Sequence, residues 1–206
     1  MRRLLQLHPQ VKKIYHESFL LKKCPTREVL LKFVEQRGIN PKDNWGEKVP
    51  FYPSARKYPI VRYCQTWYDF FGSNSRIIHI VRHPYDISLS TVKKFKQIND
   101  IEKPLKVYRK IMPGAIENIG NIKTSYTFKY EDLLIDPDRM IEKVYSHCGL
   151  KPDIDYKSRM KQIKNKRYQI IDPSRAFAYK DQKVDWPDFK DVIDALNKIQ
   201  GVKYTS

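Results

Sequence analysis

The stretch RIIHIVRHPYDISLS, residues 76–90, decides the fold. It begins with an apolar run that ends at Arg82, which is the pattern of a buried strand. His83-Pro84 marks a turn, and the residues that follow have helical spacing and carry Ser90. A strand that feeds a helix leaves a crevice at its carboxyl end, where α/β proteins tend to bind anions. The Arg82 guanidinium can bind a phosphate through two donors, and the Ser90 hydroxyl can donate beside it.

Helical and strand patterns alternate along the rest of the chain. A loop is expected at 40–54, and a second strand is expected at 126–130. The 3.6-residue periodicity and the capping signals predict helices within 26–38, 59–72, 84–97, 105–119, 136–149 and 187–199. We therefore expect an α/β layered fold with a central parallel sheet, in a single domain that spans residues 1–206.

The composition limits the classes of function. Lys and Arg number 40 against 23 Asp and Glu, a formal charge of +17, which attracts nucleotides, acidic glycans, nucleic acid or anionic membrane. The three cysteines form no C-x-x-C pair, so we expect neither a disulfide framework nor a metal site. No apolar run approaches a membrane span and the first residues do not form a signal peptide, which is typical of a cytoplasmic protein as the chain stands.

Residues 76–90 resemble the 3′-phosphate-binding segment of the sulfotransferase family, whose members use 3′-phosphoadenosine 5′-phosphosulfate as donor. In that family a strand is followed by an Arg, an x-Pro turn, an Asp, and a Ser eight positions after the Arg. The resemblance implies that Arg82 and Ser90 hold the donor's 3′-phosphate. It also implies a relative of the P-loop kinase fold and transfer of a sulfuryl group to a hydroxyl or amine. On spacing alone, a strand–turn–helix joint with a solvated arginine is the alternative.

Two further segments are similar to family motifs. In residues 126–153, Tyr130, Glu131 and Asp132 match a block to which we assign a structural role, with carboxylates that cap or pair with a basic partner. In WGEKVP, residues 45–50, Lys48 matches the family lysine, although valine follows it where the family has threonine. The resemblance implies that Lys48 neutralises charge on the transferred group, and a solvated loop lysine is the alternative.

Residues 8–21 resemble the family segment that returns across the acceptor mouth. Transfer to a hydroxyl needs a base within hydrogen-bond reach of that hydroxyl. Glu17 is the candidate base, with His16 behind it. The structural alternative is a helix-capping Glu17 and a packed or solvated His16.

The family opens with a strand and a loop resembling Gly-x-x-Arg-Ser-Gly-Thr-Thr, which holds the 5′-phosphosulfate. No glycine precedes Gly38 in this chain, so we expect an N-terminally truncated domain that lacks this loop and binds the donor weakly. Three explanations stay open: a start placed too late, a relic with little activity, or a loop supplied by another chain.

Two alternatives of other classes share part of the pattern. A basic nucleic-acid-binding module without catalysis fits the charge and the 14 tyrosines, 9 phenylalanines and 3 tryptophans, which can stack on bases. It lacks a named nucleic-acid motif, so a small nucleotide is favoured over nucleic acid. A nucleoside kinase shares the architecture. The sequence does not name the acceptor: carbohydrate, protein tyrosine, lipid and small alcohol stay open, and an acidic glycan suits the positive surface.

Overall fold

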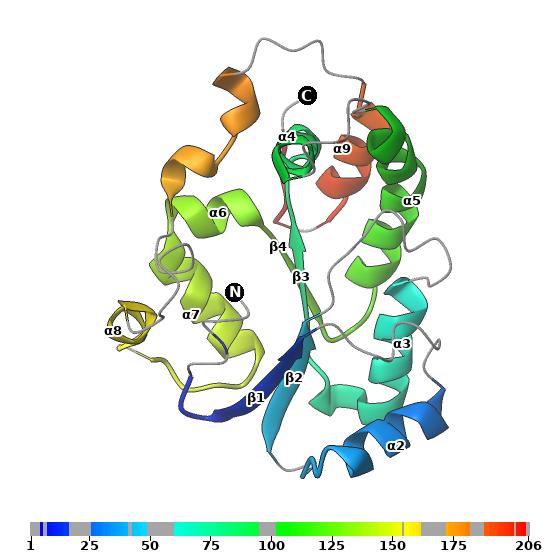
Figure 1. Cartoon of the computed structure of the whole chain (residues 1–206), viewed down its shortest axis with the longest axis vertical. Helices are drawn as coiled ribbons and strands as arrows, with labels where there is room; N and C mark the ends of the chain where they lie inside the picture. The colour runs from blue at the N-terminus through cyan, green and yellow to red at the C-terminus, as the bar shows by residue number, and fades with distance from the viewer. Residues whose placement is uncertain are drawn as a thin grey trace.

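The computed structural model describes residues 5, 8–16, 26–40, 43–48, 60–94, 102–153, 155–161, 172–181, 188–199 and 201–204. Its strands are β1 (Val11–His16), β2 (Asn44–Lys48), β3 (Ile77–Val81) and β4 (Ser125–Lys129). Its α-helices are α2 (Arg27–Gln36), α3 (Ile60–Phe71), α4 (Pro84–Lys94), α5 (Glu102–Gly120), α6 (Tyr130–Ile135), α7 (Pro137–His147), α8 (Tyr156–Lys161) and α9 (Lys190–Asn197). Its 3₁₀ helices are η2 (Gly72–Asn74), η4 (Pro173–Arg175) and η5 (Ala178–Asp181). Figure 1 shows β3 and β4 in the middle of the molecule, with α5 on one side and α6 and α7 on the other.

The strands β3 and β4 pair in parallel, with Ile77 beside Ser125 and Val81 beside Lys129. Successive side chains of a strand point to opposite faces. Val81 therefore packs with α5 and α9, whereas Ile78 packs on the other face with α7. Helices thus cover both faces of this sheet, as the near-continuous apolar sequence of β3 predicts.

Three groups of buried side chains form the core. The first joins β3, α5, α9 and the chain after α9: Val81, Met112, Ile116, Phe189, Val192, Ile193, Leu196, Val202 and Tyr204. The second joins β4, α6, α7 and the residue after α7: Phe128, Leu133, Met140, Ile141, Val144, Tyr145 and Leu150. The third lies between α2, α3 and β2, where Leu30 and Phe33 pack against Trp45 and Trp67. The first two groups fix the two faces of β3, and so the position of the residues that follow it.

The two predicted strands and most predicted helices are confirmed, but the sheet that β1 forms with β2 is not expected from the sequence. Residues 44–48, expected within a loop, form β2, which pairs in parallel with β1. Gly46 and the charged residues near it do not have the alternating pattern of a strand, so β2 depends on its pairing with β1. Trp45 also holds it in place, because its ring packs on that of Trp67 with centroids 5.3 Å apart. The described residues therefore hold two two-stranded parallel sheets, where the sequence predicts one central sheet. No helix among them is long and apolar enough to cross a membrane.

Helix α7 begins at the predicted Asp136-Pro137 signal. The Asp136 carboxylate accepts a hydrogen bond from Arg139 N at 3.3 Å, and Pro137 occupies the first turn. We expect Asp136→Ala to lower the free energy of unfolding by about 1 kcal/mol, the usual effect of losing an N-cap. Asp136→Ser, which keeps a capping oxygen, is the matched control and should lose only a few tenths of that amount. Urea unfolding of the two variants decides, and equal losses would contradict the assignment of Asp136 as the cap.

Candidate functional site

The turn after β3 is held by a hydrogen bond to the helix that follows the neighbouring strand β4. Val81 ends β3, and Pro84 begins α4, where its fixed φ suits the first helical position. Between them, His83 N donates to Glu131 Oε1 at 2.9 Å. Glu131 belongs to α6, which follows β4 directly. The turn that carries Arg82 is therefore tied to the element after the paired strand.

Arg82 lies at the carboxyl end of β3 with 17% of its side chain exposed. Its Nη2 atom donates to the Arg175 carbonyl at 3.2 Å and lies 3.8 Å from Asp86 Oδ2. Its guanidinium carbon lies 5.2 Å from the centroid of the Tyr130 ring, a cation–π distance. Its buried Nε donates no hydrogen bond within the described ranges. The guanidinium is thus held on several sides while part of its surface reaches solvent.

Asp86 and Ser90 lie on α4, four residues apart and so on the same helix face. The Asp86 side chain is wholly buried, and burial raises the pKa of its carboxyl against the lowering effect of Arg82. Ser90 is exposed one turn further along. Asp86 thus lies near Arg82, at 3.8 Å, and shares a helix face with Ser90. That Arg82 and Ser90 bind a phosphate stays a prediction.

Glu131 is the centre of a buried polar group. Its Oε1 accepts from His83 N and its Oε2 accepts from the Tyr204 hydroxyl at 2.7 Å. The His83 ring stacks on the Tyr179 ring, with centroids 4.3 Å apart and planes at 15°. The sequence predicts carboxylates that cap or find a basic partner here. Asp132 does pair with Lys129 at 3.2 Å, whereas Glu131 is bound by neutral donors. The sequence does not predict the role of Tyr204, because one tyrosine far from any motif carries no local signal.

Burial raises the pKa of Glu131, and the hydrogen bonds from His83 and Tyr204 oppose that rise without cancelling it. A carboxyl whose folded-state pKa is raised binds its proton more tightly when folded, so its contribution to stability falls as pH rises through that window. The free energy of unfolding of the wild type minus that of Glu131→Gln should therefore fall from about pH 4 upward and then level off. Urea unfolding across this range measures the difference. A difference that is constant or rises with pH would contradict the assignment, and Glu142→Gln, at an exposed carboxyl on α7, is the control.

The structure brings together two motifs that are separate in the sequence. The strands β1 and β2 align so that His16 is the register partner of Lys48. The segment expected at the acceptor mouth thus runs beside the segment with the family lysine. Glu17 lies outside the described residues, and so do the side chains of His16 and Lys48. Their predicted chemical roles stay predictions.

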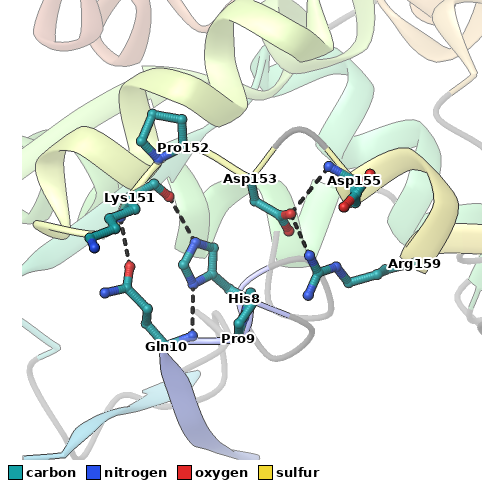
Figure 2. Close-up of a pocket in the computed structure, with 8 residues that line it drawn as sticks. All are labelled: His8, Pro9, Gln10, Lys151, Pro152, Asp153, Asp155 and Arg159. Atoms are coloured by element: carbon teal, nitrogen blue, oxygen red, sulfur yellow. Dashed lines mark hydrogen bonds and ion pairs between the residues drawn. The ribbon is translucent and has the colours of Figure 1, made fainter.

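A pocket of about 350 Å³ lies elsewhere, between residues 8–10 and 151–159 (Figure 2). The buried His8 ring bridges its two walls: Gln10 N donates to His8 Nδ1 at 3.1 Å, and Nε2 lies 2.9 Å from the Lys151 carbonyl. Because Nδ1 accepts, the proton is on Nε2, which donates to that carbonyl. Arg159 pairs with Asp153 at 2.6 Å in the same pocket. These contacts join the start of β1 to the chain after α7, and the pocket is lined by none of the predicted site residues.

Comparison with known proteins gives a consistent result. Residues 61–154, which include Arg82 and Ser90, match the sequence model of the sulfotransferase family. The chain is 28% identical, over 125 residues, to the omega-hydroxy-beta-dihydromenaquinone-9 sulfotransferases of Mycobacterium bovis and Mycobacterium tuberculosis. Each alignment covers 50% of this chain and 32% of the relative, so the chain spans about a third of the length of these relatives.

Two solved structures share the fold. The sulfotransferase domain of the curacin biosynthetic pathway has a TM-score of 0.56 at 17% identity, covering 83% of this chain and 66% of that domain. The sulfotransferase domain of the Synechococcus PCC 7002 olefin synthase has a TM-score of 0.57 at 18% identity, covering 83% of this chain and 62% of that domain. The residues around Arg82 are therefore set in a fold that these domains also have.

Proposed function

We propose that the chain, in which residues 61–154 match the sulfotransferase family model, binds 3′-phosphoadenosine 5′-phosphosulfate and takes part in sulfuryl transfer to a hydroxyl or amine. The observation that carries this proposal is the placement of Arg82 at the carboxyl end of β3, within the segment that matches the family. A P-loop-kinase-like architecture is part of the same proposal, and the parallel pairing of β3 with β4 supports it.

In this proposal Arg82 and Ser90 hold the 3′-phosphate of the donor. A guanidinium and a hydroxyl are suited to a phosphate because both donate hydrogen bonds to its charged oxygens. Arg82 is already oriented by the Arg175 carbonyl, which reduces the entropy lost when a ligand binds. Ser90 is accessible on the same side as Asp86. The formal charge of +17 adds a long-range attraction for an anionic donor.

The proposed transfer balances without a further reactant. The acceptor oxygen or nitrogen attacks sulfur, a new bond to sulfur forms, and the bond from sulfur to the bridging phosphate oxygen breaks. Adenosine 3′,5′-bisphosphate leaves with that electron pair, and a base takes the acceptor's proton. Glu17 is proposed as this base, and Lys48 is proposed to neutralise charge on the transferred group. The pairing of His16 with Lys48 supports a common location for the two segments.

The acceptor is proposed as a hydroxyl or amine compound, and an acidic glycan is compatible with the chain's charge. The mycobacterial relatives are named for a different acceptor, a hydroxylated dihydromenaquinone. The comparisons do not favour the nucleic-acid-binding alternative.

Calorimetric titration with two related nucleotides tests the donor site. We expect adenosine 3′,5′-bisphosphate to bind at least tenfold more tightly than adenosine 5′-monophosphate, because a charge-assisted hydrogen bond to the 3′-phosphate contributes about 1.5–3 kcal/mol. The monophosphate is the matched control, since it differs only in that phosphate. Equal affinities, or no binding of the bisphosphate, would contradict the proposal. Steep salt-dependent binding to single-stranded DNA would instead support the nucleic-acid alternative.

A further inference from the structure

The segment 172–181, which contains η4 and η5, is joined to the turn after β3 and to the start of α4. The backbone N–H of Tyr179 donates to Asp86 Oδ1 at 3.0 Å. The Tyr179 ring is stacked on the His83 ring. One residue of the segment thus contacts the turn and the helix through two different kinds of interaction.

The same segment also holds the proposed ligand-binding arginine. The Arg175 carbonyl accepts the hydrogen bond from Arg82 Nη2. Arg175 ends η4, and its carbonyl position follows from the path of the chain to Tyr179. Any movement of the segment away from α4 would therefore remove the acceptor that orients Arg82.

Between η4 and η5, the backbone adopts a conformation that is rare for its residue type. Phe177 has a φ of 56°, in the left-handed region that bulky side chains disfavour. Its ring packs at the edge of the first core group. Such a conformation persists only where the surroundings impose it, and it is frequent at functional sites. The segment is therefore held in one defined path.

The Asp86 carboxylate binds segment 172–181 through a hydrogen bond from its backbone. This carboxylate is wholly buried, which is unfavourable unless the charge is bound. Among the described residues Oδ1 accepts from Tyr179 N, whereas Oδ2 accepts no hydrogen bond and faces Arg82 at 3.8 Å. The carboxylate thus lies between the segment and the guanidinium, in contact with both.

We propose that Asp86 is a positioning residue, which anchors segment 172–181 so that the Arg175 carbonyl keeps the Arg82 guanidinium in place at the carboxyl end of β3. The proposal rests on the function proposed above for its consequence in ligand binding. The anchoring itself is independent of any nucleotide and is testable without one.

Hydrogen exchange in the unliganded chain of residues 1–206 tests the anchor. We expect Asp86→Ala to make the amides of the peptide that covers 172–181 exchange roughly tenfold faster, since Tyr179 N loses its acceptor. Asp86→Asn keeps an oxygen that accepts from the same N–H and should exchange within about twofold of the wild type. Asp194→Asn, at an exposed position of α9, is the control and should change nothing. Wild-type exchange in Asp86→Ala would overturn the proposal.

Titration with adenosine 3′,5′-bisphosphate tests the consequence at Arg82. We expect Asp86→Ala to bind the bisphosphate about tenfold more weakly, and Asp86→Asn to bind it with nearly wild-type affinity. Tenfold is the lower end of the loss found at metal sites when a residue that supports a ligating side chain is replaced. A merely structural Asp86 would leave the affinity of the folded variant unchanged, and that result would overturn the positioning role. If the wild type does not bind the bisphosphate, the proposed function fails, and the exchange experiment alone decides the anchor.

A second variant keeps the test valid if Asp86→Ala does not fold. Tyr179→Ala keeps the backbone donor but removes the ring stacked on His83. We expect the amides of 172–181 to exchange faster than in the wild type, and the bisphosphate to bind more weakly. Both effects should be of about the same size as in Asp86→Ala. Unchanged exchange and unchanged affinity in this variant would overturn the proposal as well.

Discussion

Replacing Arg82 by alanine is expected to weaken binding of adenosine 3′,5′-bisphosphate by about 100-fold. Each charge-assisted hydrogen bond to a phosphate contributes about 1.5–3 kcal/mol, and every 1.4 kcal/mol corresponds to a factor of ten in affinity. A guanidinium that presents two donors to the phosphate therefore accounts for about two orders of magnitude. Arg82 is suited to this because its side chain is already held by the Arg175 carbonyl and by Tyr130. Isothermal calorimetry at fixed ionic strength measures the effect.

Two matched variants separate a specific contact from general charge. Arg82→Lys keeps the charge but loses the fork of donors, so it should bind with intermediate affinity. Arg139→Ala removes a guanidinium that is 60% exposed on α7, and it should bind like the wild type. Unchanged affinity in Arg82→Ala would count against the donor site. An equal loss in Arg139→Ala would show that the chain attracts the nucleotide only through its overall charge.

Glu131→Ala should lower the free energy of unfolding by about 3 kcal/mol or more. The change leaves two buried donors, His83 N and the Tyr204 hydroxyl, without their acceptor. Leaving one buried donor unpaired costs about 1–3 kcal/mol, and the lost side-chain volume adds to this. Because the slope of urea unfolding is typically about 1–3 kcal/mol per molar, the midpoint should fall by about 1–2 M. The loss should appear by circular dichroism without any ligand.

Tyr204→Phe tests the hydrogen bond between Tyr204 and Glu131 by removing its donor. It removes one donor and leaves a buried carboxylate oxygen without it, so we expect a loss of about 1–3 kcal/mol. Glu142→Ala, at an exposed position of α7, should change stability by less than about 0.5 kcal/mol. If Glu131→Ala and Glu142→Ala have the same stability, then the buried hydrogen bonds to Glu131 do not stabilise the fold.

Local signals in the sequence predict the elements around the site. The run Ile77–Val81 is apolar and rich in β-branched residues, and it forms β3 as expected. Thr26 and Asp136 both cap helices, because a side-chain oxygen before a helix satisfies an amide in its first turn. Gly149 has a φ of 67° after α7, in agreement with the predicted stop. In each case the residues that decide the structure lie within one turn of one another.

What the sequence does not predict depends on partners far along the chain. Tyr130, expected at the end of a strand, begins α6, because the tertiary contacts of Glu131 favour a helix there. The acceptor for Arg82 is a backbone carbonyl 93 residues away. Every residue has such a carbonyl, so no residue type marks it in advance. Candidate ligand-binding side chains can thus be found from motifs, whereas the groups that orient them require the fold.

The parallel pairing of β3 with β4 has a consequence for synthesis of the chain. About 40 residues separate the two strands, so β3 leaves the ribosome several seconds before its partner at an elongation rate of about 5–20 residues per second. During that interval the edge that β4 later occupies is open on a nascent chain rich in isoleucine, which is a template for intermolecular association. Fragments that end before Ser125 should therefore aggregate or remain bound to chaperones, and slow codons placed between the strands should lower the soluble yield.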